Sequence, residues 1–104
     1  PKRLAGQELA AAVEKLGPGW VVTSDGRDAV TREFRFVGPE QTSVFIAQVL
    51  RIAKLANSFP DVTTTFNRVT VRLSTIEVHG VTELDISVAR ELGHVCDLSH
   101  GCQL

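Results

Sequence analysis

The sequence lacks the features that assign many proteins to a function class directly. No apolar run approaches the roughly 20 residues needed to span a bilayer. The net charge of −1 provides no basic field for nucleic acid or an anionic membrane. A glycine-rich phosphate loop, a pair of catalytic carboxylates and a Ser-His-Asp order are also missing. These absences argue against membrane, nucleic-acid-binding and common nucleotide-binding or hydrolytic proteins.

Cysteine is scarce as well, with only Cys96 and Cys102 near the end of the sequence. The first residues make a poor signal peptide, because Glu8 and Glu14 recur there at helical spacing. Without a secretory signal, we expect a reducing, cytoplasmic compartment and no disulfide.

The last residues, 94–104, show no clear periodicity and predict a flexible tail after a helix that ends at Gly93. His94, Cys96, His100 and Cys102 form two H-x-C pairs in this tail. Structural zinc sites usually have C-x2–4-C or H-x3–5-H spacing, which these pairs do not match. We therefore expect no metal here and interpret both cysteines as incidental.

The residues that are present suit one domain over 1–104, since 43% of the 104 residues are hydrophobic. Apolar spacing and turn signals predict three helices and four strands. The predicted helices are 7–16, 39–57 and 83–92, and the predicted strands are 20–23, 29–37, 61–66 and 69–74. The order α-β-β-α-β-β-α implies an α+β fold, a four-stranded antiparallel sheet with three helices on one face. An open sheet edge in such a fold favours pairing with a second copy.

Two features leave alternatives open. Ile46 and Leu50 flank the apolar stripe of the long helix, which suits either a well-buried helix or a second apolar face used in self-association. Several strand arginines form either a polar patch for a protein partner or an ordinary solvated face. These arginines are Arg32, Arg35, Arg68 and Arg72.

In this order and spacing, the sequence resembles pterin-4a-carbinolamine dehydratases over about residues 4–93. The shared marks are a tryptophan after the first helix, an F-x-F strand, a proline after the long helix, an aromatic-Asn-basic step and an acidic residue in a capped helix start. In this chain they are Trp20, Phe34, Phe36, Pro60, Phe66-Asn67-Arg68 and Asp85. The resemblance implies the same fold as the element order does.

The catalytic histidines of that family are missing. Ser58 and Phe59 stand where the family has His-His before its proline, and Ile76 stands at the position of the third histidine. Dehydrating a carbinolamine requires groups that exchange protons near neutral pH, which suits histidine. Phenylalanine and isoleucine cannot transfer protons. We therefore expect a catalytically inactive protein with no catalytic residues and no cofactor.

The resemblance extends to a branch that lacks these histidines, whose best-known member is the RuBisCO assembly factor of α-carboxysome-containing bacteria. It implies a cytoplasmic or carboxysome-associated homodimer that chaperones the RuBisCO large subunit without nucleotide or metal. We expect the contact region at the degenerate pocket and on nearby exposed groups. The candidate contact residues are Ser58, Phe59, Phe66, Arg68, Arg72, Ile76 and His79.

Two alternatives remain. The first is an active dehydratase whose site is rebuilt around His79 and Asp85, although His79 is more typical of a surface histidine. The second is a transcriptional coactivator, since some proteins of this family bind a transcription factor.

Overall fold

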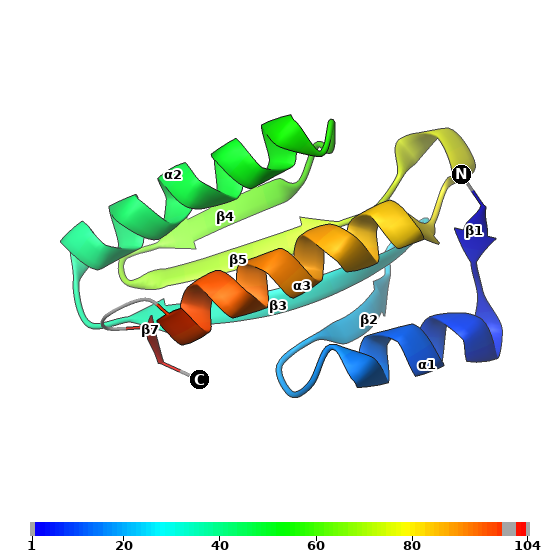
Figure 1. Cartoon of the computed structure of the whole chain (residues 1–104), viewed down its shortest axis with the longest axis horizontal. Helices are drawn as coiled ribbons and strands as arrows, with labels where there is room; N and C mark the ends of the chain where they lie inside the picture. Colours follow the sequence, from blue (N-terminus) through cyan, green and yellow to red (C-terminus); the bar gives the residue numbers. More distant parts are fainter. Residues whose placement is uncertain (1, 99–101, 104) are drawn as a thin grey trace.

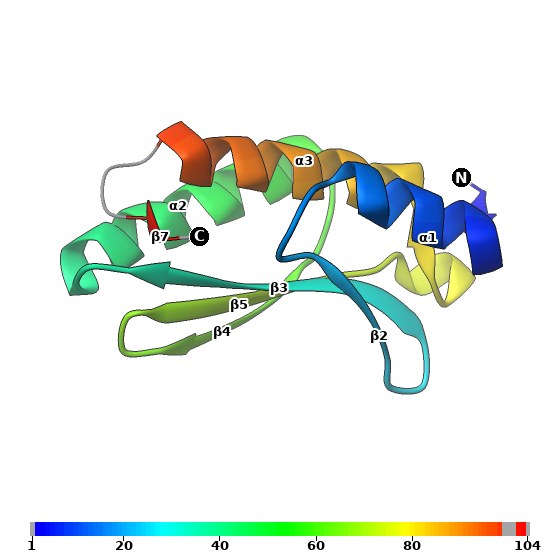
Figure 2. The same ribbon diagram turned by 90° about the horizontal axis from the view of Figure 1, so that it is seen from below.

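The computed structural model describes residues 2–98 and 102–103 and consists of a layer of helices on a twisted sheet. Three helices, α1, α2 and α3, cover one face of this sheet (Figure 1, Figure 2). The four main strands run in the order β2-β3-β5-β4, and every neighbouring pair is antiparallel. The bounds are α1 Gly6–Lys15, β2 Val21–Ser24, β3 Asp28–Phe36, α2 Pro39–Leu55, β4 Asp61–Thr65, β5 Arg68–Leu73 and α3 Glu83–Leu98. The predicted α+β fold is confirmed.

Strand β3 shows why the helices cover this face. Phe34 and Phe36 are fully buried toward the helices, whereas Glu33 and Arg35 between them face solvent. Phe45 of α2 lies against both buried rings, with centroid distances of 4.6 and 4.9 Å. This alternation confirms the predicted half-buried strand, and the aromatic contacts join it to the long helix.

The two residues beside the stripe of α2 take different environments. Ile46 is half-buried against the core, while Leu50 is 56% exposed. The helix therefore keeps an exposed apolar group on the side of Leu50.

Arg32 is not part of a polar patch with the other strand arginines. Period-two alternation places it beside Phe34 on the core face, where it is only 8% exposed. Arg35 and Arg68 lie on the open face, and both pair with Glu33, at 3.4 and 3.6 Å. The predicted patch is wrong for Arg32, because one strand cannot point residues 32 and 35 to the same side.

Short elements complete the fold. Strands β1 (Arg3–Leu4) and β6 (Val81–Thr82) form a second, two-stranded sheet, and a 3-10 helix, η1, spans Ile76–Val78. None of these elements is predicted above, because two or three residues carry no periodicity. Among the described residues, no helix is both long and apolar enough to cross a membrane.

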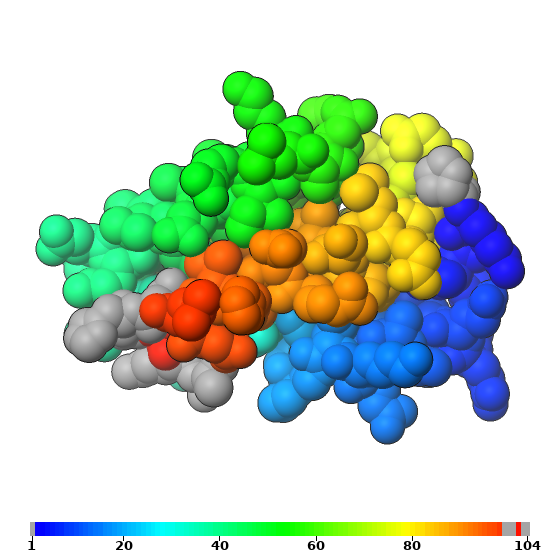
Figure 3. All heavy atoms as spheres, in the orientation of Figure 1, coloured from blue at the N-terminus to red at the C-terminus, as the bar shows by residue number. Residues whose placement is uncertain are grey.

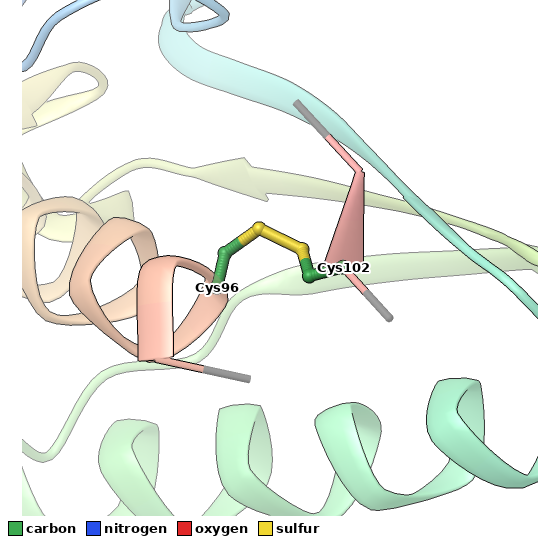
Figure 4. The surroundings of a disulfide bond; sticks show 2 residues. All are labelled: Cys96 and Cys102. Atoms are coloured by element: carbon green, nitrogen blue, oxygen red, sulfur yellow. A yellow bond between two sulfur atoms is a disulfide. The ribbon is translucent and has the colours of Figure 1, made fainter. Parts of the chain in front are cut away.

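The predicted end of the last helix at Gly93 is wrong, and so is the prediction of incidental, unpaired cysteines. Helix α3 continues to Leu98, and strand β7 (Cys102–Gln103) pairs with the end of β3. Cys96 and Cys102 form a disulfide with a Cα–Cα distance of 5.5 Å (Figure 4). The described residues of 94–104 are thus in regular structure, whereas 99–101 and 104 lie outside the described residues, and His100 with them.

The physical reason is that the buried face of α3 does not stop at Gly93. Val88, Leu92 and Cys96 recur every four residues and are all buried. Glycine weakens a helix interior by only about 1 kcal/mol, so this burial can outweigh it. The two sulfur atoms are bonded to each other and are therefore not available as thiolate ligands for zinc.

Reducing this disulfide should lower the free energy of unfolding by about 2 kcal/mol, because the bond closes a loop with a sequence separation of 6. Urea denaturation with and without dithiothreitol measures the difference. The Cys96→Ser/Cys102→Ser double variant is the matched control and should not respond to the reductant. Two reactive thiols in the untreated native protein would contradict the disulfide.

Candidate functional site

The three positions at which the family's histidines are expected come together in space. Ser58 and Phe59 follow the end of α2, Ile76 opens η1, and all three line one small recess. We call it the Phe59 recess. Its volume is about 40 Å³, and its lining residues are Asn57, Ser58, Phe59, Ser74, Thr75, Ile76, Glu77 and Leu84.

The end of α2 fixes one wall of the Phe59 recess. The N–H of Ser58 donates to the carbonyl of Ala53 at 2.8 Å, and the N–H of Asn57 donates to the carbonyl of Lys54 at 3.2 Å. This is the Schellman arrangement, in which the residue after the helix adopts the left-handed conformation. Asn57 takes that position with φ of 55°, which asparagine tolerates better than most residues. Ser58 is buried as a result, and Phe59 is left 75% exposed.

The opposite wall is fixed by a buried carboxylate. Oδ2 of Asp85 accepts from the backbone N–H of Thr82 at 2.9 Å and from the hydroxyl of Thr75 at 2.8 Å. The bond from Thr82 to a residue three positions later is one half of a capping box, as the sequence predicts. Since Thr75 directly precedes η1, Asp85 anchors the segment that carries Ile76.

Asp85 is fully buried, and its second oxygen, Oδ1, has no hydrogen-bond partner among the described residues. Burial raises the pKa of Asp85, and the hydrogen bonds from Thr82 and Thr75 offset part of that rise. His79 is exposed, with φ of 53°, at the end of η1. Neither His79 nor Asp85 lines the Phe59 recess, so the structure does not bring them together there.

The other predicted contact residues lie elsewhere. Phe66 is 79% exposed at the turn between β4 and β5. Arg68 and Arg72 lie on the open face of the sheet, where Arg72 is 3.5 Å from Asp61. Of the seven predicted contact residues, the recess unites only Ser58, Phe59 and Ile76.

A neighbouring groove was not predicted from the sequence. It has a volume of about 330 Å³, shares Asn57, Ser58 and Phe59 with the Phe59 recess, and extends along α2 to Leu50. Leu50 is 56% exposed, and Ile76, on the recess itself, is 57% exposed. The only sequence signal for this groove is the placement of Leu50 beside the apolar stripe of α2.

The lining of the Phe59 recess is largely uncharged. Among its lining residues only Glu77 has an ionisable side chain, and none carries an imidazole. Fold and site together define a pterin-dehydratase-like protein without the usual proton-transfer groups. The sequence model described as Pterin 4 alpha carbinolamine dehydratase matches residues 2–95, and the chain belongs to this family.

Relatives and solved structures agree with that membership. Two relatives are provisionally named pterin-4-alpha-carbinolamine dehydratase. The protein from Burkholderia ambifaria is 35% identical to this chain over 94 residues, which are 90% of each chain. The protein from Brucella ovis is 38% identical over 93 residues, which are 89% of this chain and 94% of the relative. The crystal structure of a transcriptional coactivator/pterin dehydratase from Brucella melitensis is 37% identical, covers 90% of this chain and 98% of its own, and has a TM-score of 0.83. A pterin dehydratase-like protein identified as a RuBisCO assembly factor in the alpha-carboxysome has a TM-score of 0.65 over 77% of this chain and 92% of its own, at 14% identity, a likeness of fold alone.

Asp85 should make stability depend on pH. Because its pKa is raised in the folded state, the folded protein binds this proton more tightly than the unfolded chain does. The free energy of unfolding from this group therefore rises as pH falls from 7 and levels off below about 4. Asp85→Asn keeps an acceptor for Thr82 and should remove this contribution.

Urea denaturation of the wild type and of Asp85→Asn at several pH values between about 4 and 7 measures the difference in their free energies of unfolding. A wild-type-minus-variant difference that is flat, or that grows with pH, would refute the assignment to Asp85.

Proposed function

We propose that this chain is a non-catalytic member of its family that acts by binding a protein partner at the Phe59 recess. One observation carries the proposal. Where proton transfer would be required, the chain places Ser58, Phe59 and Ile76 around a recess of about 40 Å³. Small-molecule sites usually measure about 300 Å³ or more. The recess by itself therefore lacks both the proton-transfer groups and the volume of a pterin site, and the adjoining groove of about 330 Å³ is not lined by Ile76.

The surroundings of the recess support a protein partner. Phe59 and Ile76 are 75% and 57% exposed, and the groove beside them leads to the exposed Leu50. Exposed large apolar side chains that cluster beside a groove are typical of protein-binding surfaces. An aromatic group such as Phe59 is the kind of anchor that contributes most to such contacts.

The partner that we propose is the RuBisCO large subunit, with the chain acting as an assembly factor in the cytoplasm or at the α-carboxysome. This assignment rests on the resemblance to the branch without histidines. The chain would hold large subunits in an arrangement competent for assembly, through contacts alone and without nucleotide or metal. A transcription factor is the second candidate, because the similar Brucella melitensis protein is described as a transcriptional coactivator.

We further propose that the chain works as a homodimer. Strand β4 is an edge of the main sheet, and its Thr63, Thr64 and Thr65 are all exposed. Because these three threonines are uncharged and β-branched, this part of the edge can extend into a second copy by antiparallel pairing. A two-fold pair would present two Phe59 recesses to a symmetric partner.

Purified protein should not accelerate carbinolamine dehydration above the rate in buffer, because no lining residue of the Phe59 recess can act as both acid and base near neutral pH. The matched variant is His79→Ala, which should behave as the wild type does. Measured turnover that His79→Ala abolishes would establish an active, rebuilt site and overturn the proposal.

Binding to the partner should depend on Phe59 and not on apolar exposure in general. Phe59→Asp should weaken binding to RuBisCO large subunit at least about tenfold, since it places a charge at the centre of the contact. Phe66→Asp is the matched control, because Phe66 is equally exposed (79% against 75%) but lies at the hairpin between β4 and β5.

The RuBisCO large subunit is immobilised on a surface, and each variant is titrated over it. The binding curves give the affinities of Phe59→Asp and Phe66→Asp. Equal loss in the two variants would count against the Phe59 recess as the contact. Wild-type protein that captures a transcription factor and no large subunit from a native lysate would favour the second candidate.

A further inference from the structure

Arg32 presents a buried charge without a hydrogen-bond acceptor. Its side chain extends from β3 to the helical side of the sheet, and the residue is only 8% exposed. Among the described residues, no hydrogen bond or ion pair is formed by its guanidinium. A guanidinium carries five N–H donors, and those of Arg32 have no protein acceptor among the described residues but are not fully buried, so they can reach a ligand or solvent. The desolvation lowers the pKa of Arg32, while Asp97 acts in the opposite direction.

The surroundings hold this guanidinium in place without satisfying its donors. Its central carbon lies 4.4 Å from the centre of the Phe34 ring and 5.9 Å from that of Trp20, both within cation–π range. Two glycines leave room for it. A Cβ at Gly19 would come within 2.9 Å of Nε, and one at Gly93 within 3.5 Å of a terminal nitrogen. Aromatic faces stabilise the charge but offer no acceptor in the plane of the guanidinium.

The guanidinium lines a recess between the end of α1 and the middle of α3, which we call the Arg32 recess. These two helices lie side by side on the helical face, α1 in blue and α3 in orange (Figure 3). The recess measures about 520 Å³, within the range of small-molecule sites. Its charged or titratable lining residues are Lys15, Arg32, Arg90, Glu91, His94 and Asp97.

We propose that the Arg32 recess binds a small organic anion and that Arg32 holds its single carboxylate or phosphate group. The planar fork of a guanidinium matches two oxygens of either group. Lys15 and Arg90 add positive charge at the rim. Glu91 and Asp97 line the same recess and disfavour ligands with several negative charges. The Arg32 recess shares no lining residue with the Phe59 recess, so this site is independent of the proposed function.

Trp20 provides a direct signal for binding. It is the only tryptophan in a sequence without tyrosine, and its ring lies beside the Arg32 guanidinium. Benzoate and phenyl phosphate serve as organic ligands, and acetate and inorganic phosphate as bare headgroups, with chloride balancing ionic strength. At least one organic ligand should change Trp20 fluorescence saturably, with a Kd below about 1 mM. The stronger of the two identifies the preferred headgroup.

Two variants test whether Arg32 and its recess carry the binding. Arg32→Lys keeps the charge but loses the fork, and should weaken binding at least about tenfold. Gly93→Leu should fill the recess and abolish the response, while the helix gains propensity. Arg35→Lys, on the opposite face of β3, is the matched control and should bind as the wild type does.

The proposal fails if no ligand gives a saturable response. It also fails if Gly93→Leu gives the same fluorescence response as the wild type. The result for Gly93→Leu is sufficient by itself if Arg32→Lys does not fold. Circular dichroism of each variant establishes whether it is folded before the titration.

Discussion

The carboxylate of Asp85 joins the end of β5 to the beginning of α3, and the geometry of the candidate site depends on it. One oxygen accepts from Thr82 at the helix start and from Thr75 at the end of the strand. The short 3-10 helix between these two residues is thereby held beside the end of α2. This contact costs desolvation of a charge, and one oxygen remains without a partner among the described residues. The contact therefore fixes the position of Ile76 relative to Ser58 and Phe59.

Backbone hydrogen bonds at the end of α2 fix the other wall of the Phe59 recess. The Schellman end of α2, with Asn57 in the left-handed conformation, still presents two consecutive side chains next to η1. Those side chains are Ser58 and Phe59, and Ile76 lines the same recess of about 40 Å³. The lining carries no imidazole, and the exposed side chains of Phe59 and Ile76 provide the apolar surface on which the proposed protein contact rests.

The sequence predicts those parts of the fold that repeat over several residues. Strand β3 alternates over nine residues, and α2 carries an apolar stripe over 17, so their type and buried faces follow from pattern. The convergence of Ser58, Phe59 and Ile76 follows from the family resemblance and not from spacing. Two-residue strands, the pairing of β7 with β3 and the disulfide depend on contacts between distant segments. Gly93 is misleading for a related reason, since burial of Cys96 outweighs the preference of glycine for a helix end. The sequence predicts only part of the environment of Arg32. Alternation places it on the core face beside Phe34, but Trp20 and the two glycines around it come from the loop before β2 and from α3.

The central claim is that the Phe59 recess does not accept a pterin. The most direct test is a titration of isotope-labelled protein with a reduced pterin, followed by the backbone amide resonances of Ser58, Phe59 and Ile76. The account predicts no saturable shift common to all three resonances at millimolar ligand, because they share only the recess of about 40 Å³, whereas the groove of about 330 Å³ is lined by Ser58 and Phe59 without Ile76. Saturable shifts centred on these three residues would show that the pterin site is intact and would contradict the account.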